Sequence, residues 1–256
     1  MLTSSIRKTS CAAALCLVSL LAFDASAADV QYKGDKLTIK FDKQLDETIY
    51  ILGADEEVPG IVLVATEEDL LGIYVGVSHI SVKGGPQDDT LVIDESVILG
   101  GHLNIKTGDG HDYVKLAGFF SKNVKVNLGK GDDVLQEGDG GSSLIVGGSC
   151  TIKAGAGHDD VDIHGDMLVF GSMSVDLGKG SPDNGDLHLM NGPYEIAKTL
   201  SVRLSKQGDE DIAFEDVEAS KLIVRGGNGD NSIDMLSGDN VFGEETYKKI
   251  DAILLP

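Results

Sequence analysis

From Val77 to Asn240 the chain alternates apolar and polar residues in short stretches joined by turns rich in glycine and aspartate. The unit of an alternating stretch, a turn and a second alternating stretch occurs seven times. Alternation with a period of two indicates β-strands that turn one face to a core and the other to water. The seven copies read ISVKGGPQDDTLVI, LNIKTGDGHDYVKL, VKVNLGKGDDVLQE, CTIKAGAGHDDVDI, MSVDLGKGSPDNGDLHL, LSVRLSKQGDEDIAF and LIVRGGNGDNSIDM.

Aligned on the first turn position, the copies fall into columns. Successive copies are 21 to 27 residues apart, a period typical of stacked structural repeats, and the turn position holds Gly85, Gly108, Gly129, Gly155, Gly178, Ser205 and Gly227. Three residues earlier stands an apolar column of Val82, Ile105, Val126, Ile152, Val175, Val202 and Val224. A second apolar column follows the turn, with Leu91, Val114, Leu135, Val161, Leu187, Ile212 and Ile233. A third apolar patch precedes the next copy, as at Phe119–Phe120.

Three short strands in each copy cannot bury their apolar faces alone, but stacking the copies buries them. Equivalent strands then pair in parallel at a spacing of about 4.8 Å. We therefore predict an all-β fold with a single domain, a right-handed parallel β-helix with three short strands in each coil of about 23 residues. A βα repeat is excluded because such a unit leaves too little room for a crossover helix.

The flanks of the repeat predict the remaining organisation. Residues 28–76 alternate but lack the glycine turn, so we expect them to form an N-terminal cap and a first coil before the repeat solenoid of residues 77–240. In residues 241–256, Tyr247, Ile250 and Leu254 follow a helical spacing, and we expect this segment to cap the C-terminal end.

The first 27 residues have the features of a secretory signal peptide. Two basic residues precede an apolar run, and the small residues Ala25–Ala27 follow it as a cleavage site. The apolar run is too short to span a membrane permanently. We therefore expect a secreted protein, extracellular or periplasmic, without a membrane span.

The chain is strongly acidic, with 42 Asp and Glu against 21 Lys and Arg and a formal net charge of −21. A field of that sign repels phosphate, so we expect no nucleic-acid partner, and cations become the expected ligands. We also expect a monomer; the sequence identifies no protein or polysaccharide partner. Cys150 is the one cysteine after the signal peptide, and its place in an apolar column predicts a buried, inert thiol.

The turns are the candidate site of chemistry. Four of them fit x-G-x-G-x-[D/N]-x-U-x, where U is a large apolar residue: 107–115, 128–136, 154–162 and 226–234. This pattern resembles the calcium-binding nonapeptide G-G-x-G-x-D-x-U-x of the haemolysin-type (RTX) family. The resemblance is divergent, because only Gly226–Gly227 keeps the doubled glycine and one turn occurs in each coil instead of two.

The resemblance implies that calcium binds along one edge of the solenoid. In that family turn carbonyls and aspartates ligate the ion, and the matching positions here are Asp112, Asp133, Asp159, Asp89 and Asn231. Two alternatives remain open. An aspartate after a glycine turn often accepts main-chain N–H groups without any metal, and the basic column of Lys83, Lys106, Lys153, Arg203 and Arg225 could supply the counter-charge. Zinc held by His111, Asp132 and His158 is a less favoured option.

These observations favour a secreted, acidic, non-enzymatic β-helix protein with calcium-binding turns and a structural or surface-binding role outside the cell. The alternative function is a β-helix polysaccharide lyase or hydrolase that acts on an acidic polysaccharide. The near-uniform repeats, without long loops on one face, and the absence of Trp make a sugar-binding catalytic cleft the less favoured option. We therefore expect no catalytic residues.

Overall fold

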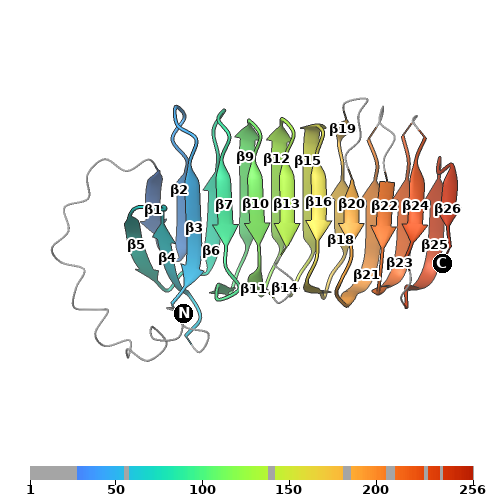
Figure 1. The fold of residues 1–256 in the computed structure, drawn as a ribbon. Helices are drawn as coiled ribbons and strands as arrows, with labels where there is room; N and C mark the ends of the chain where they lie inside the picture. The colour runs from blue at the N-terminus through green and yellow to red at the C-terminus, as the bar shows by residue number, and fades with distance from the viewer. Residues whose placement is uncertain are drawn as a thin grey trace, which may run out of the picture.

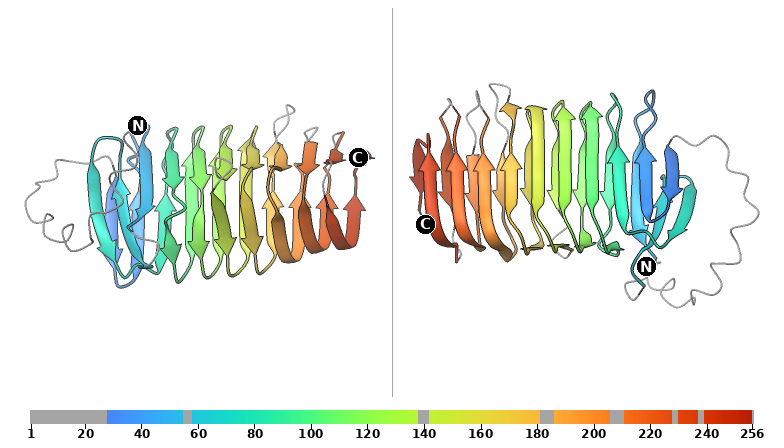
Figure 2. Two further views of the ribbon diagram at one scale, coloured as in Figure 1. Left: turned by 60° about the horizontal axis from the view of Figure 1, so that its bottom comes forward. Right: turned by 180° about the vertical axis from the view of Figure 1, so that it is seen from behind.

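The computed structural model describes residues 28–54, 58–137, 142–180, 186–205, 211–227, 230–236 and 239–255, and these residues form β-strands without a helix. They wind into a parallel β-solenoid of about seven coils, each of roughly 23 residues (Figure 1). The strands facing the viewer run down and those behind run up as the chain advances from its N-terminal to its C-terminal end, so the winding is right-handed (Figures 1 and 2). The expected signal peptide at residues 1–27 lies outside the described residues.

Three ladders of parallel strands build the walls. The first ladder contains the strand that precedes each turn: β2 (Lys36–Lys40), β6 (His79–Lys83), β9 (Leu103–Asp109), β12 (Val124–Lys130), β15 (Cys150–Gly157), β18 (Met173–Asp176) and the second halves of β21 (Tyr194–Arg203), β23 (Val217–Arg225) and β25 (Val241–Lys248). The short β19 (Lys179–Gly180) extends the pairing of β15.

The second ladder contains the strand that follows each turn. Its members are β3 (Thr48–Gly53), β7 (Thr90–Ile93), β10 (Tyr113–Leu116), β13 (Val134–Glu137), β16 (Asp160–Ile163), β20 (Leu187–Leu189), β22 (Asp211–Phe214), β24 (Ser232–Met235) and β26 (Ala252–Leu254). The third ladder contains β8 (Ile98–Leu99), β11 (Gly118–Phe120), β14 (Ser143–Val146), β17 (Asp166–Val169) and the first halves of β21, β23 and β25.

The third ladder merges into the first from β21 onward. In earlier coils small or glycine-containing corners such as Gly100–Gly101 and Gly147–Gly148 separate the two strands. In β21 the corner lacks glycine and the chain passes through it as one strand of 10 residues, with a register irregularity between Ile196 and Thr199. From β21 onward the two short strands of each coil thus join into one bent strand.

The core consists of the apolar columns expected from the sequence. Ile105, Val126 and Ile152 pair in register and are at most 2% exposed, as are Val114, Leu135 and Val161 in the second ladder. Cys150 is free and fully buried, and burial raises the pKa of its thiol to about 12. The prediction of a buried, inert thiol is confirmed with respect to burial, and a thiol of that pKa is not a nucleophile at neutral pH.

The N-terminal end is closed by antiparallel strands. β1 (Asp29–Lys33) pairs antiparallel to β2, and β4 (Ile61–Ala65) and β5 (Leu70–Val75) continue antiparallel from β3. The Tyr32 hydroxyl donates a hydrogen bond of 2.7 Å to the main-chain oxygen of Val75, and so connects β1 to β5. Antiparallel strands at this end prevent further parallel stacking onto β2 and β3.

The C-terminal segment differs from the expectation based on helical spacing. Residues 241–248 and 252–254 form β25 and β26, which pair in parallel with β23 and β24. The segment thus adds one more coil, and the helical spacing of its apolar residues is coincidental. Its apolar side chains remain partly uncovered among the described residues, with Val241 and Leu254 each 54% exposed. No helix in the described part of the chain is long and apolar enough to cross a membrane.

Candidate functional site at the aspartate turns

The five turn residues singled out in the sequence occupy one buried column at the start of the second ladder. Asp89, Asp112, Asp133 and Asp159 stack in consecutive coils and are at most 2% exposed. Asn231 holds the same place, two residues before an inward-facing Ile, three coils further on, and is 1% exposed. The turn residues between them, 181–185 and 206–210, lie outside the described residues.

Each of the four carboxylates accepts a main-chain hydrogen bond: Asp89 Oδ2 accepts the Gly85 N–H of its own turn at 3.0 Å, and the other three accept from the preceding coil. The Asp89 N–H donates to Asp112 Oδ1 at 2.8 Å, and the Asp112 N–H donates to Asp133 Oδ1 at 2.8 Å. The Asp133 N–H donates to Asp159 Oδ1 at 3.1 Å. One oxygen of each aspartate therefore satisfies a buried main-chain donor.

The inner column contains two further acids that the sequence analysis missed. Glu47 precedes β3 as Asp89 precedes β7, is 6% exposed, and accepts the Asp42 N–H at 3.0 Å. Asp251 precedes β26 and accepts the Asn231 N–H at 2.9 Å. Neither coil has the glycine turn used for alignment. The signal that identifies both is an acid two residues before the first inward apolar residue of the second strand.

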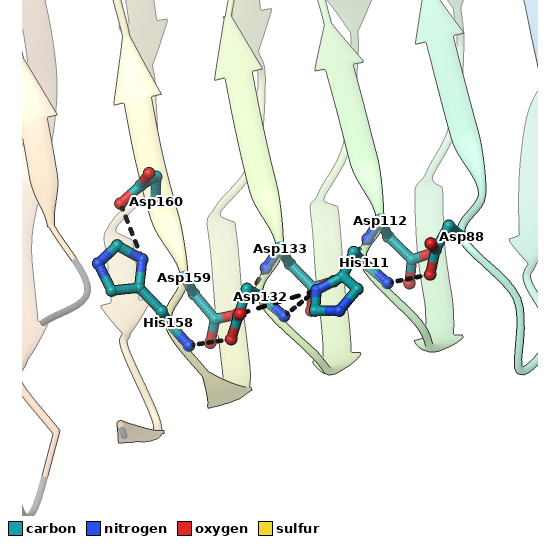
Figure 3. Close-up of polar contacts among 8 residues, drawn as sticks. All are labelled: Asp88, His111, Asp112, Asp132, Asp133, His158, Asp159 and Asp160. Carbon is teal, nitrogen blue, oxygen red and sulfur yellow. Dashed lines mark hydrogen bonds and ion pairs between the residues drawn. The ribbon is translucent and has the colours of Figure 1, made fainter. Parts of the chain in front are cut away.

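A second, outer column runs beside the inner one and is accessible to solvent (Figure 3). The His111 N–H donates to Asp88 Oδ1 at 2.6 Å, the Asp132 N–H donates to His111 Nδ1 at 3.0 Å, and the His158 N–H donates to Asp132 Oδ1 at 2.8 Å. Here each side chain accepts from the following coil, whereas Asp112, Asp133 and Asp159 of the inner column accept from the preceding coil. Adjacent turn residues therefore bind each coil to both of its neighbours.

The turn glycines make this close stacking possible. Gly129 has φ of +114°, and a Cβ atom there would lie 1.7 Å from the main-chain oxygen of Gly108. Gly131 has φ of +126°, and its Cβ atom would lie 1.8 Å from the oxygen of Gly110. Both the left-handed backbone and the contact with the preceding coil therefore require glycine, which explains the G-x-G pattern.

Burial makes the inner carboxyls weak acids. Desolvation raises the pKa of Asp133 to about 7, against the opposing hydrogen bond from the Asp112 N–H and together with the negative charges of Asp159 and Asp112. Burial likewise raises the pKa of Asp89 to about 7 and that of Asp159 to about 6, and it raises the pKa of Asp112. At neutral pH the column therefore holds both protons and negative charge, and its titrations are coupled.

The second oxygen of each aspartate has no protein partner. Asp89 Oδ1, Asp112 Oδ2, Asp133 Oδ2 and Asp159 Oδ2 are buried and accept no hydrogen bond. The basic column does not supply their counter-charge, because among the described residues Arg203 pairs only with Asp176, at 3.6 Å, and Lys83, Lys106 and Lys153 form no ion pair. The oxygens are thus available to a proton or to a cation.

The fit to a metal is partial. Hard carboxylate oxygens suit calcium, and each of the four stacked turns offers one oxygen without a partner. Over the described ranges, however, no group of three or more His, Cys, Asp or Glu side chains is placed to hold a metal ion, and this includes the column of His111, Asp132 and His158. A calcium ion here would therefore need further ligands from main-chain oxygens of the turns or from water.

Comparison with protein-family models, with curated proteins and with solved structures found no match to this chain. The geometry defines the class, a parallel β-solenoid with a buried carboxyl column at one edge. The resemblance to the haemolysin-type repeat depends on the turn residues alone and stays a prediction.

Proposed function

We propose that the chain is a secreted, non-enzymatic β-solenoid with a structural or surface-binding role, and that its aspartate turns take up calcium. The observation that carries the proposal is the inner column: stacked, buried carboxyls that each give one oxygen to the main chain and keep the other without a protein partner. Their hydrogen bonds support a structural role. Their uncompensated charge supports a cation.

Protons and calcium ions would compete for the inner carboxyls of the turns. When an inner carboxyl is protonated, its charge no longer needs a cation. When it ionises, calcium would interact with the free oxygen together with main-chain oxygens of the glycine turns. Calcium should therefore stabilise the folded chain at slightly alkaline pH and have little effect in acid.

Thermal unfolding with and without calcium tests this. A ligand at about 100 times its dissociation constant adds about 2.7 kcal/mol to the free energy of unfolding, and for a chain of this size that corresponds to a rise in melting temperature of about 5–10 °C. We expect such a rise in millimolar calcium relative to chelator at about pH 8, little change near pH 5, and no comparable effect of magnesium. Identical melting in calcium and chelator at both pH values would remove the metal from the proposal.

The non-enzymatic part has a separate test. Incubation with polygalacturonate or alginate should release no new chain ends. Cleavage that Arg203→Ala or Arg225→Ala abolishes would contradict the proposal and favour the lyase or hydrolase alternative instead.

A further inference from the structure

The outer surface of the first ladder has a regular chemical composition. We call it the basic face and define it by three columns of residues that point away from the core. The column next to the turn contains Lys40, Lys83, Lys106, Asn127, Lys153, Asp176, Arg203, Arg225 and Lys248. The middle column contains Thr38, Ser81, Asn104, Lys125, Thr151, Ser174, Ser201, Ile223 and Thr246.

The third column of the basic face contains Lys36, His79, His102, Asn123, Ser149, Ser172, Thr199, Lys221 and Glu244. Its polar side chains connect neighbouring coils, for example through the His102 N–H, which donates to His79 Nδ1 at 2.9 Å, and the Ser149 N–H, which donates to Asn123 Oδ1 at 2.9 Å. This column is therefore partly engaged in holding the coils together. The two others present their side chains to solvent, apart from Ser81, which is 4% exposed.

Charge is sorted between the faces of the solenoid. The basic face carries ten of the 21 Lys and Arg residues in the chain but only two, Asp176 and Glu244, of its 42 acidic residues. The turn edge is acidic, as at Asp132, and the outer surface of the second ladder is acidic from β16 onward, as at Asp160 and Asp162. A strongly acidic molecule thus has one side where positive charge dominates.

Most cations of this face lack a protein counter-ion. Lys40 pairs with Asp29 at 2.9 Å, Arg203 with Asp176 at 3.6 Å and Lys221 with Glu244 at 2.5 Å. Across the part of the chain that the structure describes, Lys83, Lys106, Lys153 and Arg225 form no ion pair. Lys83 and Lys106 lie in adjacent coils, about 4.8 Å apart, as do Arg203 and Arg225, and these like charges repel each other, so a bound polyanion would relieve that repulsion.

We propose that the basic face binds a linear anionic polysaccharide that lies along the solenoid axis. Its acidic groups would contact the column of Lys83, Lys106 and Lys153, and its hydroxyl groups would exchange hydrogen bonds with the Ser, Thr and Asn side chains of the middle column. At the N-terminal end of the face, a pocket of about 580 Å³ is lined by Lys40, Lys43 and Lys83 together with Asp29 and Asp42.

The side chains of the face favour a polysaccharide over a single-stranded nucleic acid. Binding of single strands depends on aromatic side chains that stack on the bases, and the three columns contain no Phe, Tyr or Trp. The middle column instead offers hydroxyl and amide groups at nearly every coil, which match a ligand that carries hydroxyls between its charges.

This inference names a ligand for the surface-binding role proposed above and uses a face distinct from the calcium turns. The test is binding of the full chain to immobilised alginate and polygalacturonate, which carry carboxylates, to dextran sulfate, which carries sulfates, to uncharged dextran, and to single-stranded DNA. We expect the charged polysaccharides to be bound at low salt, with affinity that falls as salt rises, and dextran not to be bound. Binding of only the carboxylated or only the sulfated polymers identifies the acidic group.

A matched pair of triple variants locates the site. Lys83→Gln, Lys106→Gln and Lys153→Gln together should weaken binding about 10-fold or more, because three charge contacts are lost. The control, Lys115→Gln, Lys122→Gln and Lys130→Gln, removes the same number of charges outside the three columns of the basic face and should alter binding by less than about 2-fold. Melting curves identical to that of the parent chain exclude a folding defect in either variant.

Four results would each overturn the inference. Two concern the polysaccharides: uncharged dextran binds as tightly as the charged polymers, or no charged polysaccharide binds at all. The others are an equal loss of binding in the two triple variants and tighter binding of DNA than of any polysaccharide. The calcium experiment is read out separately by melting. If no polysaccharide binds but calcium raises the melting temperature, only the polysaccharide site is refuted. If polysaccharide binds but calcium leaves the melting temperature unchanged, only calcium binding at the turns is refuted.

Discussion

Two columns of like-charged side chains run along the solenoid, the buried carboxyls of the inner column and the exposed lysines and arginines of the basic face. Where like charges occupy adjacent coils, as Asp112 and Asp133 or Lys83 and Lys106 do, they are about 4.8 Å apart, a distance at which they repel by about 0.9 kcal/mol in water and by several times more in a protein interior. Lys106 reaches water and is screened there, whereas Asp133 is fully buried. The same repeat thus tolerates stacked charge on its surface but must neutralise it inside, with protons or with a cation.

The largest expected difference between the two columns is the effect of pH on the free energy of unfolding, which should come from the inner column. The folded inner carboxyls bind protons that the unfolded chain releases between about pH 4 and pH 7, so the free energy of unfolding should decrease as pH rises through that window. With two carboxyls titrating near pH 7, we expect a decrease of about 3 kcal/mol between pH 6 and pH 8. Urea unfolding in chelator at constant ionic strength measures it, and a constant or rising free energy would contradict the raised pKa values.

Removing one member of each column should give unequal losses. Asp133→Ala leaves the buried Asp112 N–H without an acceptor and opens a small cavity, so we expect a loss of about 2 kcal/mol in the free energy of unfolding. Lys106→Ala should change it by less than about 0.5 kcal/mol. Chemical unfolding of the two variants side by side provides the measurement. Equal losses would mean that burial is not what distinguishes the columns.

A milder substitution isolates charge from hydrogen bonding. Asp133→Asn keeps an oxygen for the Asp112 N–H and removes the charge, and Asn231 already occupies the equivalent position in another coil. In chelator at about pH 8 we expect the variant to be more stable than the parent by about 1 kcal/mol, with the gain vanishing near pH 5 where the parent carboxyl is protonated. The variant should also respond less to calcium. Lower stability than the parent at both pH values would refute the view that the charge is what destabilises this position.

The smallest effect is expected for the exposed column. The triple variant Lys83→Gln, Lys106→Gln and Lys153→Gln should retain the melting temperature of the parent within about 2 °C, because exposed charges without ion pairs contribute little to stability. Differential scanning calorimetry measures this change. A large loss of stability would show that these side chains support the fold, and the basic face would then need a structural explanation.

The strands that form the walls of the solenoid are predicted well, because each depends on a pattern within a few consecutive residues. Period-two alternation and the fixed distance from the turn place Val126 and Leu135 in the core without knowledge of any other coil. The strands and the stacking of the seven repeats follow from that pattern and are confirmed. At the C-terminal end three apolar residues lie at helical spacing although the segment forms strands, because a few such residues fit a strand and a corner equally well.

The chemistry of the turns is less accessible to sequence reasoning. Local preference places an aspartate after a glycine in a solvated turn, but Asp133 is buried because Asp112 and Asp159 lie directly before and after it in neighbouring coils. Glu47 was missed because its coil lacks the turn glycine. The basic column was visible as Lys83, Lys106 and Lys153, but only the strand register shows that it shares a face with a column of hydroxyl and amide groups.

Every coil meets its neighbours through the same set of positions, as Val126 does with Ile105 and Ile152. A duplicated unit from Leu103 to Asn123 would therefore find a matching rung above and below, and the molecule would lengthen by one step of about 4.8 Å. A partial duplication would instead place polar residues opposite apolar ones along all three walls. The length of such a protein thus changes by whole coils. A gene that gains or loses one complete repeat changes the length of the solenoid and leaves the packing of the remaining core unchanged.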